Sequence, residues 1–144
     1  MRQTLRDFCE LAWIVGHNED VSLLASSLSC EGFMCEDVRG PYSREQQKYA
    51  SQIRTFINHQ NAWKKVLKSG EPGLIVEADF VPCRHFGSLP LPCPYDGEDY
   101  GIFCWLYTAG FTIYGIDKHG HVFGHGNALV AYLISPKGAR ACLD

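Results

Sequence analysis

Two acidic residues separated by one alanine, Glu77-Ala78-Asp79, are the feature of the sequence with the clearest chemical meaning. They lie in the apolar stretch Leu74–Val81, which predicts a buried strand. Side chains two positions apart in a strand point to the same side, so both carboxylates should face one way. Open α/β sheets bind their ligands at the carboxyl ends of strands. This pair is therefore a candidate ligand-binding site.

Two carboxylates at this spacing supply the hard oxygen donors that Mg²⁺ and Mn²⁺ prefer, and water and phosphate oxygens can complete the coordination. A metal held there would neutralise a diphosphate leaving group and so promote sugar transfer. Acidic pairs also occur at solvated strand ends that bind nothing. The spacing alone leaves both interpretations open.

The elements that precede this pair alternate between strand and helix. The apolar run Leu11–Gly16 predicts a strand buried on both faces. We expect next a helix over Val21–Leu28, capped by Asn18 or Asp20 and ended by Gly32, and then a short strand over Phe33–Val38.

A long amphipathic helix should connect this region to the acidic pair. Ser43 with Gln46 three residues later is a capping-box pattern. Apolar residues then recur at spacings of three, four and seven and define one helical face, and Gly70 can end the helix. The residues on that face are Tyr49, Ile53, Phe56, Ile57, Trp63, Val66 and Leu67.

The remaining chain has no periodicity from Pro82 to Tyr100, as expected of a functional or mobile segment. Strands are predicted after it, over Ile102–Tyr107, Phe111–Ile116 and Ala128–Ile134. Ser135-Pro136 provides an N-cap and a first-position proline for a final helix over Lys137–Asp144. The pattern predicts an α/β domain.

Composition excludes several classes of protein. The chain has 144 residues, with 13 basic and 16 acidic side chains and a net charge of −3. This length suffices for one hydrophobic core, and the acidic balance argues against general nucleic-acid binding. No apolar run is long enough to cross a bilayer, and the N-terminus has no signal-peptide core. The seven cysteines form no CxxC pair and are expected to be mostly small buried hydrophobes.

Histidines in the second half suggest a different metal site. His119, His121 and His125 form an HxHxxxH pattern, and Cys83 lies two residues before His85. Zinc needs three or four converging ligands, whereas these histidines fall among glycines with no paired cysteine motif. A polar hairpin loop is therefore favoured over a zinc site. A Cys/His hydrolase has no local signature in this sequence.

Three blocks of the chain resemble glycosyltransferase family 25, which includes lipopolysaccharide-modifying and procollagen galactosyltransferases. Ile57–Val66 (INHQNAWKKV) is similar to the family helix "cxxSHxxaWkka", and Leu74–Val81 (LIVEADFV) to the strand "liLEDDv". Val130–Ala139 (VAYLISPKGA) is similar to "aYliSrkgA". The order and approximate spacing of the blocks agree with the family.

The resemblance implies a GT-A-like (Rossmann-like) fold with a mixed, mostly parallel sheet flanked by helices, a nucleotide-sugar donor, most often UDP-linked, and bound Mn²⁺ or Mg²⁺. Glu77 and Asp79 match the outer acids of the family motif and are the expected metal ligands. Glu77 and His59, which matches the helix histidine, are the catalytic candidates, while Trp63 matches the tryptophan. Gly16, His17, Asn18 and Glu19 follow the first strand, where GT-A proteins approach the nucleotide, and are expected to contact the donor with Glu77 and Asp79.

The expected activity is metal-dependent transfer of a sugar, galactose or a related hexose, to a saccharide or glycolipid acceptor. The protein is expected in the cytoplasm, with association at the inner face of a membrane left open. Three features differ from the family: Ala78 replaces the central acid, Asn58 replaces a serine, and the chain ends soon after the third block. Residues 1–144 are thus expected to form one domain, the N-terminal donor-binding part of a longer fold. The alternative is an inactive GT-A remnant that binds a nucleotide sugar or a carbohydrate.

Overall fold

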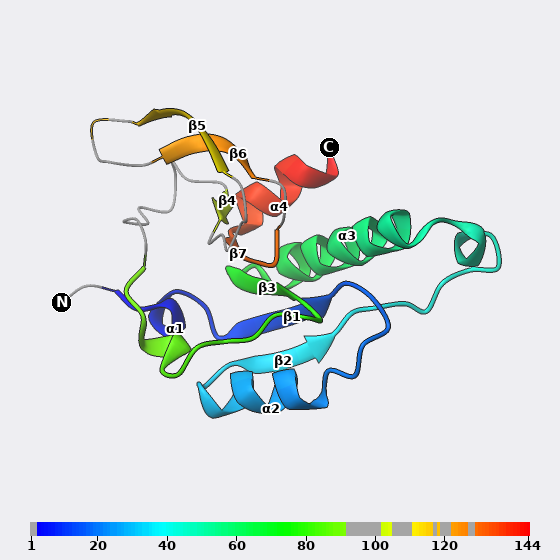
Figure 1. Cartoon of the computed structure of the whole chain (residues 1–144), viewed down its shortest axis with the longest axis horizontal. Helices are drawn as coiled ribbons and strands as arrows, with labels where there is room; N and C mark the ends of the chain where they lie inside the picture. The colour runs from blue at the N-terminus through cyan, green and yellow to red at the C-terminus, as the bar shows by residue number, and fades with distance from the viewer. Residues whose placement is uncertain (1–2, 92–101, 105–110, 117, 119–121, 127–128) are drawn as a thin grey trace.

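The computed structural model describes residues 3–91, 102–104, 111–116, 118, 122–126 and 129–144. Its main sheet has the strand order β2-β1-β3-β7-β4 (Figure 1). These strands span Met34–Asp37 (β2), Leu11–Val15 (β1), Gly73–Glu77 (β3), Ala131–Ile134 (β7) and Ile102–Cys104 (β4). β1 pairs in parallel with β2 and β3, whereas β7 is antiparallel to both β3 and β4. The prediction of an α/β fold with a mixed, mostly parallel sheet is confirmed.

Helices cover both faces of this sheet, because β1 and β3 are apolar on both sides. On one face, Ala12, Ile14, Leu74 and Val76 pack against α1 (Leu5–Phe8), α2 (Ser22–Cys30) and the 3₁₀ turn η2 (Phe86–Ser88). On the other face, Trp13, Val15 and Ile75 pack against α3 (Ser51–Ser69) and α4 (Pro136–Leu143). Figure 1 shows α2 and α3 on opposite sides of the strands. The continuous apolar runs in the sequence reflect this burial on two faces.

The local signals at helix ends are largely confirmed. The Asp20 carboxylate accepts a hydrogen bond from the backbone N–H of Ser22 at the start of α2. Gly32 and Gly70 adopt positive φ angles of 93° and 74° immediately beyond α2 and α3, as the left-handed C-terminal motif requires. Ser135 caps α4 by accepting a hydrogen bond from Gly138 N–H at 3.0 Å. Gly32 and Gly70 thus mark the C-terminal ends of α2 and α3, and Ser135 marks the start of α4.

The capping box at Ser43 forms, but it does not begin the long helix. Ser43 and Gln46 exchange reciprocal side chain–backbone hydrogen bonds of 2.9 and 3.1 Å. The turn that they cap is the 3₁₀ segment η1 (Gln46–Lys48), which ends where Tyr49 adopts an extended conformation. α3 starts only at Ser51. Our expectation of a continuous helix from Ser43 was therefore wrong.

The predicted strand Leu74–Val81 is also shorter than expected. β3 ends at Glu77, and the backbone N–H of Phe80 donates to the carbonyl of Glu77 at 2.9 Å, which closes a turn over Ala78 and Asp79. The predicted strand over Ala128–Ile134 begins at Ala131 as β7. Within Ile102–Tyr107 the described part forms β4, and residues 105–107 lie outside the described residues.

A separate two-stranded sheet pairs β5 (Phe111–Ile116), which was predicted, with β6 (Val122–Gly126), which was not. The glycines of β6 lower its strand propensity, so the sequence carried little signal for it. The register of the β5–β6 pair shifts between Ile113 and Gly115 of β5, as in a β-bulge. Several large apolar side chains of this hairpin are exposed, namely Ile113, Tyr114, Ile116 and Val122.

The cysteines are less buried than the sequence suggested. Of the cysteines whose surroundings the structure describes, Cys9 is buried, Cys35 and Cys142 are half-buried, and Cys30 and Cys83 are exposed, all as free thiols. Within the described ranges, no helix is both long and apolar enough to cross a membrane.

Candidate functional site

The carboxyl ends of three parallel strands meet at one edge of the sheet. In the register of the sheet, Val15 of β1 lies opposite Glu77 of β3, and Ile14 lies opposite Asp37 of β2. The loop that follows β1 therefore lies between the ends of β2 and β3. This is the edge at which open α/β sheets bind ligands. The structure thus brings the predicted Gly16–Glu19 loop and the predicted acidic motif to the same place.

Gly16 allows this loop to approach the acidic motif closely. Its φ angle is +105°, a conformation that L residues rarely adopt. A Cβ atom at this position would lie 3.1 Å from the backbone nitrogen of Ala78 and 3.7 Å from Cα of Glu77. Only glycine fits both the backbone conformation and the space. The side chains of the next three residues, His17, Asn18 and Glu19, are exposed.

Arg39 fixes the backbone of this loop. Its guanidinium donates hydrogen bonds to the carbonyl oxygens of His17 and Glu19, the latter at 2.8 Å. It also forms a bidentate pair with Asp37, at 2.9 and 2.7 Å. The hydrogen bonds from Arg39 lower the pKa of the Asp37 carboxyl below its ordinary value. Sequence reasoning missed this clamp, although an acid and an arginine two residues apart at a strand end were a visible signal.

Asn58 joins the same loop to α3. This side chain is fully buried, and its Nδ2 donates to the carbonyl of Gly16 at 3.0 Å and to the hydroxyl of Tyr42 at 2.6 Å. Its Oδ1 accepts the backbone N–H of Gly40 at 3.1 Å. Asn58 therefore has a clear structural role. The amide ties three chain segments together beside the site.

A cluster of the buried residues His59, Trp63 and Tyr132 and the half-buried Glu77 lies between α3 and the sheet. The hydroxyl of Tyr132 lies 2.8 Å from Nδ1 of His59 and accepts a hydrogen bond from Nε1 of Trp63, also at 2.8 Å. The rings of His59 and Tyr132 stack with centroids 5.7 Å apart. Nε2 of His59 lies 3.6 Å from Oε1 of Glu77. Tyr132 was not among the predicted site residues, although it is the tyrosine of the third sequence block.

The two acids of the motif do not share one face of a strand, which corrects the argument from their spacing. Glu77 is the last residue of β3, and its half-buried carboxylate points toward His59. Asp79 is exposed in the turn that follows, so the alternation of a strand no longer governs its direction. Ala78 is 7% exposed and belongs to the core on the opposite face. The two acids remain near one another in sequence. The turn after β3, and not the alternation of side chains along a strand, sets the position of Asp79.

The donor set at this edge consists of oxygen atoms and the imidazoles of His17 and His59. Within the described residues, no three groups drawn from His, Cys, Asp and Glu converge as a ready-made metal site. Glu77 and Asp79 are carboxylates, which fit Mg²⁺ or Mn²⁺ when water and phosphate supply the other ligands. Of the alternative zinc residues, His125 and Cys83 are exposed, and His119 and His121 lie outside the described residues. His85 precedes η2 and adopts a left-handed conformation.

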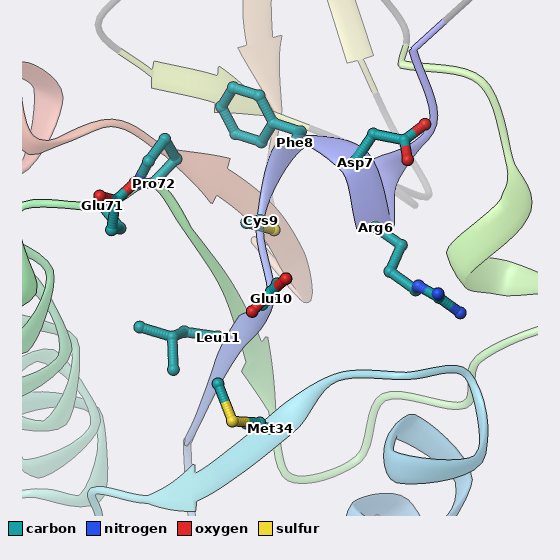
Figure 2. Close-up of a pocket in the computed structure, with 9 residues that line it drawn as sticks. All are labelled: Arg6, Asp7, Phe8, Cys9, Glu10, Leu11, Met34, Glu71 and Pro72. Atoms are coloured by element: carbon teal, nitrogen blue, oxygen red, sulfur yellow. The ribbon is translucent and has the colours of Figure 1, made fainter.

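An open cavity of about 710 Å³ lies at the opposite end of the sheet (Figure 2). Its lining includes Leu11 and Met34, the first residues of β1 and β2, and Pro72, which precedes β3. These positions are the amino ends of the parallel strands. The cavity is thus separate from the carboxyl edge that carries Glu77.

Comparison with known proteins adds no assignment. No protein-family model matches the chain, and a search of the curated proteins finds no match. The fold and the site define an α/β protein whose polar residues gather at the carboxyl edge of a mostly parallel sheet.

Proposed function

We propose that the protein is a metal-dependent glycosyltransferase of the family 25 type, which transfers a hexose from a UDP-sugar to a saccharide or glycolipid acceptor. One observation carries this proposal. The three sequence blocks that resemble the family are far apart in the chain, yet they meet in one cluster. His59 and Trp63 come from the first block, Glu77 from the second and Tyr132 from the third. This convergence supports a common site for the three blocks.

The sheet supports the same proposal. Three neighbouring parallel strands followed by the antiparallel β7 form the mixed, mostly parallel arrangement expected of a GT-A-like domain. The loop at Gly16 lies against the acidic motif, as a donor site at the end of the first strand requires. We therefore assign Gly16–Glu19 to the nucleotide and Glu77 with Asp79 to the diphosphate end of the donor.

In this scheme each group of residues has a separate task. Glu77 and Asp79 would hold Mn²⁺ or Mg²⁺, which neutralises the diphosphate leaving group when bound. Arg39 and Asn58 hold the Gly16–Glu19 backbone, so that the loop is ordered before the donor arrives. His59 lies beside Glu77 and restrains its carboxylate.

A second candidate is a binding module that retains the fold without turnover. Ala78 favours it, because the central acid of the family motif is missing here and the alanine side chain is packed in the core. Such a module would bind a nucleotide sugar or a carbohydrate through the same edge. Transfer to an acceptor is the property that separates the two candidates.

The test is calorimetric titration of UDP and UDP-galactose, with and without Mn²⁺, followed by assays of donor hydrolysis and transfer. We expect metal-dependent binding that Asp79→Ala and Glu77→Gln each weaken by about tenfold or more. Glu71→Gln, an exposed acid at the other end of β3, is the matched control and should bind as wild type. Metal-dependent binding without turnover would favour the module. Absence of UDP binding would reject the glycosyltransferase and any module that binds a nucleotide sugar.

A further inference from the structure

Tyr132 is the centre of a buried polar chain that links α3, β7 and the end of β3. The side chain is 1% exposed, and two neighbours in contact with its hydroxyl, His59 and Trp63, are 7% and 8% exposed. Both contacts to the hydroxyl are 2.8 Å long. Polar groups buried this deeply have well-defined partners, because each unsatisfied group has a large desolvation cost.

The direction of these hydrogen bonds follows from the chemistry of the groups. An indole N–H can only donate, so the Tyr132 oxygen accepts from Trp63. An ionised carboxylate can only accept a hydrogen bond. The ring atom of His59 that faces Glu77 is Nε2, so the carboxylate favours a protonated Nε2 over one with a free lone pair. A neutral imidazole carries one proton, which leaves Nδ1 as the acceptor. Nδ1 then receives the hydroxyl proton of Tyr132.

We propose that Tyr132 is a positioning residue that holds His59 in the Nε2–H tautomer and directs this N–H toward Glu77. The order of donation runs from Trp63 to Tyr132, from Tyr132 to His59, and from His59 toward the carboxylate. The orientation of a metal-ligating carboxylate by a neighbouring donor usually tunes the affinity of the site. This last consequence rests on the proposed function; the tautomer itself does not.

The tautomer is measured directly by long-range ¹H–¹⁵N correlation spectra of the ¹⁵N-labelled full chain, without metal or donor. Spectra are recorded at about pH 8.5, well above the ordinary histidine pKa of about 6.5, where imidazoles are neutral. We expect the protonated-nitrogen signal of His59 at Nε2 in the wild type and a mixture of tautomers in Tyr132→Phe. His59→Gln provides the resonance assignment.

Trp63→Phe is the matched control, because it also removes one hydrogen bond to the Tyr132 hydroxyl but leaves the contact to His59. We expect it to retain the Nε2–H tautomer. An Nδ1–H tautomer in the wild type would overturn the proposal, and so would an unchanged His59 pattern in a folded Tyr132→Phe variant. The wild-type spectrum identifies the tautomer of His59 even if the Tyr132→Phe variant does not fold.

A second measurement connects the tautomer to the site. We expect Tyr132→Phe to weaken Mn²⁺ binding by about tenfold and Trp63→Phe by less than about twofold, as measured by calorimetry with the metal alone. Equal losses in the two variants would show that Tyr132 acts only through stability and would overturn its positioning role. A failure of the glycosyltransferase proposal looks different, since UDP binding would then be absent while the Nε2–H tautomer persists.

Discussion

The hydroxyl of Tyr132 lies 2.8 Å from Nδ1 of His59, although the two residues are 73 positions apart in the chain. β7 brings the tyrosine to this point, because it pairs with β3 and places Tyr132 opposite Ile75. The antiparallel strand therefore does more than extend the sheet. It provides the tyrosine hydroxyl that contacts His59, the helix histidine beside the end of β3.

Replacement of Tyr132 by phenylalanine should destabilise the protein by about 1–3 kcal/mol, because the buried N–H of Trp63 loses its acceptor. Urea unfolding followed by tryptophan fluorescence measures the change. Tyr114→Phe is the control, since this tyrosine is 75% exposed on β5 and its loss should change the free energy of unfolding by less than about 0.5 kcal/mol. Equal effects of the two substitutions would contradict the buried network.

Asn58→Ala should cost about 2–3 kcal/mol, because it removes the amide that joins Gly16, Gly40 and Tyr42 and leaves buried backbone groups without that partner. Lys64→Ala, an exposed position in the same helix, should be nearly neutral. Thermal unfolding of the two variants, compared with wild type, tests this expectation. A fall in stability below about 0.5 kcal/mol for Asn58→Ala would show that water replaces the amide.

Two glycines that flank one turn should respond differently to alanine. A Cβ on Gly73 would overlap Cζ3 of the buried Trp13, so Gly73→Ala should cost about 3 kcal/mol or more. Gly70 has a φ of 74° with open space around it, so Gly70→Ala should cost only about 1 kcal/mol through backbone strain. The midpoints of urea unfolding rank the two. The opposite ranking would mean that Trp13 repacks easily.

The thiols should differ in reactivity according to burial. Burial raises the pKa of Cys9 to about 12, whereas Cys30 is exposed. Iodoacetamide at about pH 8 should modify Cys30 at least about tenfold faster than Cys9, because only the thiolate reacts. Peptide mapping by mass spectrometry measures both rates in one sample. Rapid modification of native Cys9 would contradict its position in the core.

The same pKa predicts a dependence of stability on alkaline pH. The folded state keeps the Cys9 proton between pH 9.0, the ordinary thiol value, and about pH 12, whereas the unfolded chain loses it. The contribution of Cys9 to stability is therefore complete below pH 9 and declines as the pH rises toward 12. Cys9→Ala should show a smaller loss of unfolding free energy over this range than wild type.

Elements that depend on local signals were predictable from the sequence. β1 follows from its apolar run, the C-terminal ends of α2 and α3 follow from Gly32 and Gly70, and the start of α4 follows from Ser135. Each of these features is decided within a few residues, so distant contacts do not alter it.

Features that depend on distant contacts were not predictable in the same way. The turn after Glu77 interrupts a stretch that stays apolar through Phe80 and Val81, so its pattern resembles a continuing strand. The partners of Asn58 and His59 come from segments 16 to 73 positions away. His59 and Glu77 could be proposed as site residues from the sequence. Only the fold shows that the hydroxyl of Tyr132 contacts both His59 and the indole of Trp63.

The pairing of β3 with β7 has a consequence for how this chain can vary. Gly73 of β3 pairs with Ile134 of β7, so these two neighbouring strands are joined by a long connecting segment of the chain. The entropic cost of closing such a segment grows only with the logarithm of its length, and each doubling of the length costs only about 0.6 kcal/mol. Insertions and deletions between the two strands are therefore cheap compared with changes within them. Natural variants should differ in length mainly between Asp79 and Leu129, outside η2 and β4, so that the sheet stays intact.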